Sequence, residues 1–175
     1  YEMEQYRNSQ EYTRVNSRFG LLVGVVQLAI LLGFWLIGGF NYLDQAVRLL
    51  GWDDVWSGVV FIGTLVLFHG LLSLPFSIYA TFVIEERFGF NKTTYVTFLA
   101  DSFKGVLLSA VIGIPVLVGV LSFFQYAGSL AWIYVWIFLT LISFVILILG
   151  PSWIMPLFNR FSPLDQGELR NRIVD

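Results

Sequence analysis

Residues 74–92 read LPFSIYATFVIEERFGFNK, and this stretch decides the fold. Its first half is apolar apart from small hydroxyl side chains. Its second half brings five charged or strongly polar side chains within eight residues, namely Glu85, Glu86, Arg87, Asn91 and Lys92. So abrupt a change is typical of a helix that leaves a lipid bilayer, because the hydrocarbon core disfavours charged groups. Pro75 lacks a backbone N–H and predicts a kink in this helix.

The composition of the whole chain indicates a polytopic membrane protein. Of its 175 residues, 57% are hydrophobic and 13% are charged, whereas about a quarter of an ordinary soluble domain is charged. The expected surroundings are therefore membrane lipid. The net charge of −2 and the lack of a basic patch argue against a nucleic-acid partner. Because the chain has no cysteine, disulfides, thiolate metal sites and cysteine nucleophiles are excluded within it.

Long uncharged intervals predict four transmembrane helices, at about residues 19–40, 56–84, 105–126 and 130–150. No charge occurs between Lys104 and Arg160, and this interval is too long for one helix across a bilayer. We therefore expect a turn at residues 125–129. Pro151 and Pro156 are expected to end the fourth span. The predicted fold class is all-α, a polytopic membrane helical bundle.

Polar segments lie before, between and after the predicted spans. Residues 1–18 are a solvated helix or tail, residues 85–104 a loop, and residues 151–175 a tail. Within the loop, Asn91, Thr93 and Thr94 are candidate N-caps for a short amphipathic helix on the membrane surface. Nine of the ten Lys and Arg residues fall on the side of both termini and this loop, and only Arg48 falls on the other. The positive-inside rule therefore predicts that the loop and both termini are cytoplasmic.

The residues of this chain do not form a recognisable catalytic or metal site. A catalytic zinc site needs about three protein ligands, and the single histidine, His69, excludes an HExxH motif here. In the middle of a span, His69 either packs against a polar group of a neighbouring helix or lines a wet cavity as a functional group. Glu85 and Glu86 do not fit the EExxxR motif of an intramembrane glutamyl protease, because Arg87 follows them at once. They are either a solvated helix end with Glu–Arg pairing or a docking point for another part of the protein.

A series of motifs, taken in order, resembles one known family. The motifs are LPFSIY at 74–79, TFVIEERFGFNKTT at 81–94, Asp101, Lys104, Gly113, Pro115, Pro151, Ile154, PLFNRF at 156–161, Pro163, Leu164 and GELR at 167–170. They resemble the amino-terminal membrane region of the type I CAAX prenyl proteases, which are integral-membrane zinc metallo-endopeptidases. The resemblance covers roughly residues 17–175 and is strongest after Leu72. Gly150 departs from the family pattern, which has a larger residue before the proline.

The resemblance implies a larger helical barrel of about seven membrane helices, of which this chain would form part. Zinc would be bound on the cytoplasmic side by the two histidines of HExxH and a distant glutamate, all of which would follow Asp175. This segment alone is therefore expected to hold no catalytic or metal residue and to be inactive. The family removes the C-terminal tripeptide from prenylated CaaX proteins, and some members act in membrane-protein quality control. The implied location is the bacterial inner membrane or the endoplasmic reticulum membrane.

The polar loop and tail would lie on the side where the catalytic domain of that family sits. We expect seven residues to dock this domain onto the membrane helices: Glu85, Glu86, Arg87, Asn91, Lys92, Asn159 and Arg160. The alternative function is a non-enzymatic membrane scaffold or a transport subunit. The protease hypothesis predicts an HExxH motif downstream in the same reading frame, whereas the scaffold hypothesis predicts a stop soon after Asp175.

Overall fold

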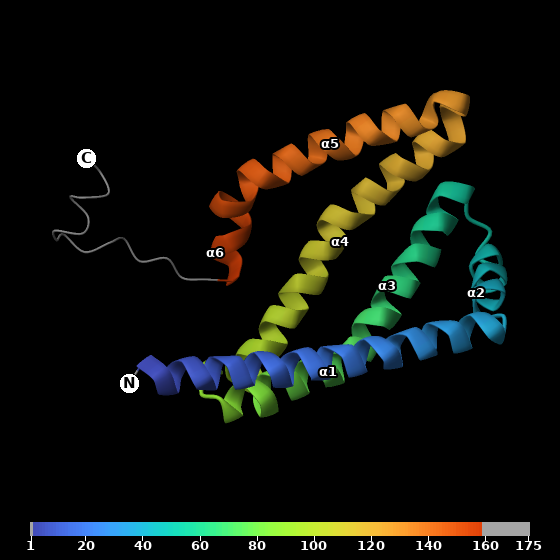
Figure 1. Ribbon diagram of the computed structural model, residues 1–175. Helices are drawn as coiled ribbons and strands as arrows, with labels where there is room; N and C mark the ends of the chain where they lie inside the picture. Colours follow the sequence, from blue (N-terminus) through green and yellow to red (C-terminus); the bar gives the residue numbers. More distant parts are fainter. Residues whose placement is uncertain (1, 159–175) are drawn as a thin grey trace, which may run out of the picture.

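The structure is a computed structural model, and it describes residues 2–158 of the chain. All the regular elements in these residues are helical (Figure 1). Four helical stretches are long and apolar enough to cross a membrane, namely Tyr6–Leu36, Asp54–Glu85, Tyr95–Tyr126 and Gly128–Phe158. The predicted fold class, a helical membrane bundle with four spans in this segment, is confirmed. The helix ends do not locate the membrane surfaces, so the limits of the predicted spans remain predictions.

The first half of the chain forms two long helices joined by a short one (Figure 1). Helix α1 spans Glu2–Leu36, α2 spans Gly39–Arg48, and α3 spans Asp54–Tyr79. Helix α3 runs directly into a π-helical segment, η1, at Ala80–Glu85. Pro75, the expected kink, lies inside α3, and the departure from α-helical geometry follows at Ala80. A π-helical segment inside a long helix is rare and often occurs at a functional site.

The second half begins with α4, which spans Tyr95–Tyr126. The remaining elements are a 3-10 turn η2 at Gly128–Leu130, α5 at Ala131–Leu149, a π-helical segment η3 at Gly150–Ile154 and α6 at Met155–Phe158. Helices α4 and α5 pack together beside η2, where the rings of Phe123 and Tyr134 are stacked with centroids 5.9 Å apart. Away from η2 the two helices separate, and α6 bends back toward the start of α4 (Figure 1).

Two local expectations differ from the structure. The surface helix expected before residue 105 is not a separate element, because α4 is continuous from Tyr95. Its start is fixed by Thr94, whose side chain accepts a hydrogen bond from the Thr97 N–H at 3.2 Å. No proline occurs between Tyr95 and Pro115 to interrupt the helix. Pro151 does not end the fourth helix either. The α-helical geometry of α5 ends at Leu149, just before this proline, but the helical path continues through the π-helical η3 to Phe158.

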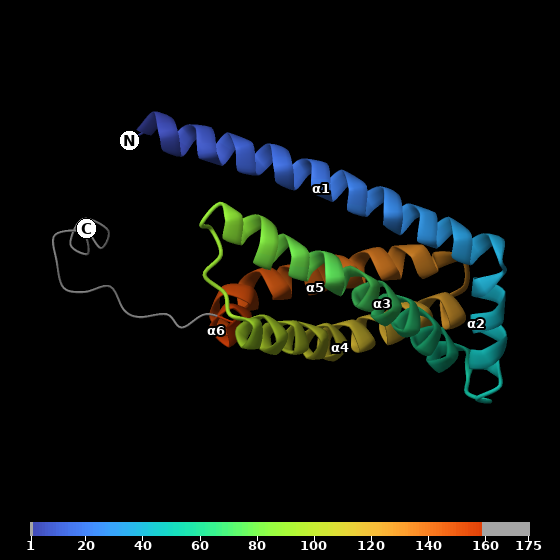
Figure 2. The same ribbon diagram turned by 90° about the horizontal axis from the view of Figure 1, so that it is seen from below.

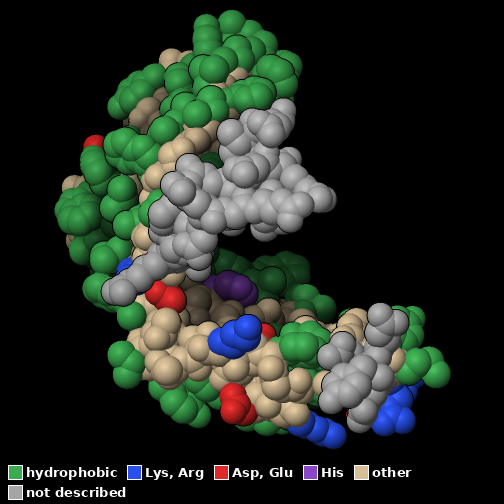
Figure 3. All heavy atoms as spheres, turned by 90° about the vertical axis from the view of Figure 1, so that its left-hand side faces the viewer, with side chains coloured by type: hydrophobic (Ala, Val, Ile, Leu, Met, Phe, Trp, Pro, Cys, Tyr) green, Lys and Arg blue, Asp and Glu red, His purple; other side chains and the backbone are tan. Residues whose placement is uncertain are grey.

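Very few apolar side chains are buried within the part of the chain that the structure describes. The buried ones are Val47, Val55, Val59, Ile84, Phe88 and Ala131, whereas most of the large apolar side chains on the four long helices are exposed. The helices form a curved wall around a hollow, as the space-filling view shows (Figure 3). Large exposed apolar faces of this kind require lipid or other protein segments against them. The fold is therefore a layer of membrane helices without a globular core.

Candidate functional site

The candidate site is the turn that follows η1, and its backbone is fixed by a Schellman motif. The Phe90 N–H donates to the Glu85 carbonyl at 2.9 Å, and the Gly89 N–H donates to the Glu86 carbonyl at 3.0 Å. Gly89 has φ 73°, the left-handed conformation that this motif requires and that glycine adopts most easily. The chain therefore leaves the helix in one defined direction, visible where η1 gives way to the loop before α4 (Figure 2).

Two of the predicted docking residues are joined directly. The Asn91 side chain donates from Nδ2 to Glu86 Oε2 at 2.9 Å, and its Oδ1 accepts from the Thr93 N–H at 2.7 Å. Asn91 therefore ties the helix end to the first residues of the next segment. Because the Glu86 carboxylate is engaged in this bond, its primary role in the chain itself is to hold the turn.

The other described docking residues, Glu85, Arg87 and Lys92, are not paired with one another. Glu85 is half-buried, while Arg87 and Lys92 are exposed. The Arg87 guanidinium carbon lies 5.6 Å from the centroid of the Phe88 ring, a cation–π contact. Among the side chains that the structure describes, no ion pair joins Glu85, Arg87 or Lys92 to another group, and the expected pairing of these glutamates with Arg87 is not formed. Asn159 and Arg160 lie outside the described residues.

An aromatic support beneath the turn was not predicted from the sequence. The Tyr12 ring of α1 meets Phe88 and Phe90 edge-on, with centroids 5.6 and 4.9 Å apart. Phe88 is 9% exposed, the lowest exposure of any residue in the turn. The signal was present in the spacing of Tyr12, Val15 and Phe19, which places these three residues on one face of a helix. The segment before the first span is therefore a structural support for the turn.

The imidazole ring of His69 does not take part in the polar contact between α1 and α3, although its carbonyl does. The Gln27 side chain of α1 donates from Nε2 to Ser73 Oγ at 3.0 Å, and the Ser73 hydroxyl donates to the His69 carbonyl at 2.8 Å. The His69 side chain is exposed, and its ring makes no hydrogen bond within the described part of the chain. No group of three or more His, Cys, Asp or Glu side chains there could hold a metal ion. The residues present therefore do not fit a zinc site of their own.

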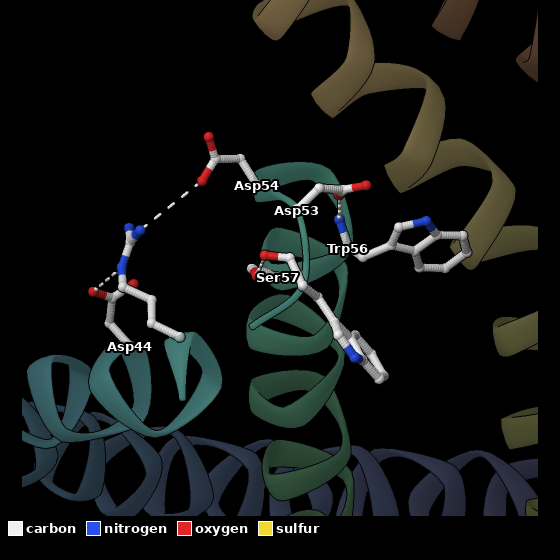
Figure 4. A network of polar contacts seen from close by, with 7 residues as sticks. Asp44, Asp53, Asp54, Trp56 and Ser57 are labelled. Carbon is white, nitrogen blue, oxygen red and sulfur yellow. Dashed lines mark hydrogen bonds and ion pairs between the residues drawn. The ribbon is translucent and has the colours of Figure 1, made fainter. Parts of the chain in front are cut away.

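A second polar cluster lies at the connection between α2 and α3 (Figure 4). Arg48 Nε donates to Asp44 Oδ2 at 2.8 Å, and its Nη1 lies 3.9 Å from Asp54 Oδ1. The hydrogen bond that Arg48 donates to Asp44, followed by the negative charge of Asp44, raises the pKa of Arg48 above its usual value. Asp53 caps α3 by accepting from the Trp56 N–H at 2.8 Å. These side chains are well exposed, so the ion pairs add little to stability, and we interpret the cluster as structural.

Taken together, the four apolar helices and the polar turn at a helix exit define a multi-pass α-helical membrane protein segment. A family model described as the N-terminal region of CAAX prenyl protease, with five membrane helices, matches residues 1–160. The chain belongs to this family, and the resemblance seen in its motifs is confirmed.

Individual relatives agree with this assignment. The chain is 34% identical to a CAAX prenyl protease 1 homolog of Arabidopsis thaliana and 33% identical to CAAX prenyl protease 1 of Saccharomyces cerevisiae. Each match covers 97% of this chain, but only 42% and 40% of the respective relative. The crystal structure of S. mikatae Ste24p matches with a TM-score of 0.86 at 32% identity, over 98% of this chain and 41% of that chain. The chain thus spans about two fifths of the length of these relatives.

Proposed function

We propose that this chain is the membrane part of a zinc metallo-endopeptidase that removes the C-terminal tripeptide from prenylated CaaX proteins. The observation that carries the proposal is the match of nearly the whole chain to the CAAX prenyl protease 1 relatives. Zinc would supply Lewis acidity and an activated water, but its ligands would lie outside this chain, which holds one histidine. The contribution of this chain would be to place substrate and catalytic part at the membrane surface. Cleavage of other membrane proteins in quality control is the alternative substrate class.

The test is a cleavage assay on the full-length protein that contains this chain. We expect the zinc-loaded protein in nanodiscs to release the tripeptide from a farnesylated CaaX peptide, and a zinc chelator to abolish this release. The unprenylated peptide is the matched control, and residues 1–175 expressed alone should release nothing. Equal cleavage of both peptides would refute the prenylated substrate and favour quality control. No cleavage of either peptide or of a misfolded membrane protein would refute the protease proposal.

We propose further that the turn docks the catalytic part of the same protein. Its hydrogen-bonded backbone and the Tyr12 support hold Glu85, Arg87 and Lys92 in place, and these three charges form no ion pair with any side chain that the structure describes. Such pre-organised charges form strong hydrogen bonds with complementary groups at a partly dry interface. Asn159 and Arg160, the two docking candidates predicted in the tail, belong to the same proposed docking surface.

Charge reversal separates docking from folding of the turn. We expect Arg87→Glu in the full-length protein to lower peptide cleavage about tenfold or more, because one buried interfacial charge pair is worth about 1.5 kcal/mol or more. Arg48→Glu, the same change in the connection between α2 and α3, is the control and should leave cleavage near that of the parent. Equal activity of the parent and Arg87→Glu would refute the docking role of Arg87.

We also propose that the turn and both ends of this segment face the cytoplasm. The proposal rests on the excess of Lys and Arg on that side. Because this chain has no cysteine of its own, single cysteines at Lys92 and Arg48 can be labelled with a membrane-impermeant thiol reagent in sealed vesicles of known orientation. Labelling of the Lys92 site from the cytoplasmic side alone is expected. The reverse pattern would contradict the orientation.

A further inference from the structure

Lys104 joins two helices that are far apart in the sequence. Its ammonium donates to Asp101 Oδ1 at 3.1 Å, on the preceding turn of α4, and to the Leu157 carbonyl of α6 at 3.3 Å. The same ammonium lies 6.0 Å from the centroid of the Phe158 ring. A lysine ammonium has three donors and no acceptor, so these contacts account for most of its bonding capacity.

The position of this contact shows which helices it holds together. Helices α4 and α5 are held together beside η2, where the Phe138 ring packs against Gly119 and Phe123. They separate toward their other ends (Figure 1). The π-helical segment η3 then turns the chain back toward α4, and Lys104 contacts the following helix, α6, at Leu157. No other hydrogen bond within residues 2–158 joins α4 to the segment after Gly150.

The chemistry of the contact makes it depend on the charge at residue 104 and not on the side chain at 157. The acceptor is a main-chain carbonyl, which every residue offers, whereas the donor is a cation that Asp101 holds in place. The Lys104 side chain is 47% exposed and that of Asp101 35% exposed, so the pair is only partly screened by solvent. A neutral side chain of the same length would keep the packing and lose both bonds.

We propose that Lys104 is a positioning residue, which holds α6 against the start of α4. It thereby fixes the end of α6 at Phe158, from which the segment that follows in the chain continues. Its effect on catalysis rests on the proposed function, because that segment would carry the zinc site. The contact itself does not rest on it and can be measured separately.

The experiment uses the full-length protein in nanodiscs, with spin labels at two pairs of exposed positions. Val96 of α4 and Met155 of α6 report on the contact, and Phe124 and Trp132 report on the packed end beside η2. The variants are Lys104→Met, which removes the charge, and Lys104→Arg, which keeps it. Arg18→Met removes an equal charge from an exposed residue of α1, which belongs neither to the turn nor to the contact between α4 and α6, and is the control.

We expect Lys104→Met to lengthen and broaden the distance distribution between labels 96 and 155 while that between labels 124 and 132 stays unchanged. Lys104→Arg and Arg18→Met should match the parent. In the peptide cleavage assay Lys104→Met should lower kcat about two- to fivefold at nearly constant KM, since a partly exposed ionic contact contributes modestly. Lys104→Arg should restore kcat, which separates positioning from a general loss of folded protein.

Two results would overturn the proposal. An unchanged distribution between labels 96 and 155 in Lys104→Met would show that the contact does not hold α6. A changed distribution with parental kcat would show that the position of α6 does not matter to the reaction. If Lys104→Met does not fold, Asp101→Asn gives the same comparison, with a smaller shift expected in the same direction. A parent without protease activity would refute the proposed function, and the distances would still decide whether Lys104 holds α6.

Discussion

The conformation of Gly89 leads to a quantitative prediction for the polar turn. At φ 73°, an alanine would pay about 1–2 kcal/mol for the left-handed backbone. A Cβ atom at this position would meet no atom within 4 Å, so no clash adds to this cost. Alanine also reduces the entropy of the unfolded chain, which offsets about 0.4–1 kcal/mol. We therefore expect Gly89→Ala to lower the free energy of unfolding by about 1 kcal/mol.

The assay is reversible unfolding by SDS in mixed micelles, followed by the fluorescence of the six tryptophans. Gly70→Ala is the matched control, because Gly70 lies inside α3 and a Cβ there also meets no atom within 4 Å. This control should raise stability by about 0.5–1 kcal/mol, since alanine favours the helix. Gly89→Asn should fall between the parent and Gly89→Ala, because asparagine tolerates the left-handed region. If Gly89→Ala were as stable as the parent or more so, the Schellman geometry of this turn would be wrong.

Three further predictions use the same unfolding assay. Asn91→Ala removes the bonds to Glu86 and Thr93 and should cost about 1 kcal/mol; a parental midpoint would show that these bonds do not hold the turn. Asp53→Ala should lower the free energy of unfolding by about 1 kcal/mol through loss of the α3 cap, whereas Asp53→Asn should leave it nearly unchanged. Equal losses in the two variants would argue against capping. Gly119→Ala places a Cβ 2.5 Å from the Phe138 ring and should lower the free energy of unfolding by about 1–3 kcal/mol. The loss should be smaller when Phe138→Leu is added, and strictly additive effects of the two changes would refute this contact.

The number and type of membrane helices could be predicted because both depend on the polarity of the individual residues, which can be taken directly from the sequence. A long interval without charged residues indicates that the segment lies in lipid, and the thickness of the bilayer sets the number of residues that a helix needs to cross it. The surface helix was predicted as a separate element because residues 85–104 were assigned to a polar loop between two spans, whereas α4 is continuous from Tyr95. In the structure Asp101 and Lys104 form an i,i+3 ion pair on one continuous helix, and Thr94 is its cap.

The sequence was sufficient to select the residues of the candidate site, but not to predict which other residues they contact. The polar side chains from Glu85 to Lys92 stand out against an apolar sequence, so composition alone selects them. The support from Tyr12 and the contact between Lys104 and Leu157 join residues that are distant in the sequence. Such pairs depend on how the helices are arranged in space, which the local residue patterns used for the prediction do not specify.

Helix α1 has one more consequence, which follows from its unbroken length of 35 residues. At 1.5 Å per residue, about 36 Å of rigid helix separates Tyr12 from the end of α1 at Leu36. A straight rod of this length works as a lever, so a tilt of about 10° pivoting at Tyr12 would displace the far end by about 6 Å. If α1 pivoted in this way, pressure on the aromatic support at Tyr12 would move α2 at the far end of the helix. A reporter placed on α2 would then register binding at the turn.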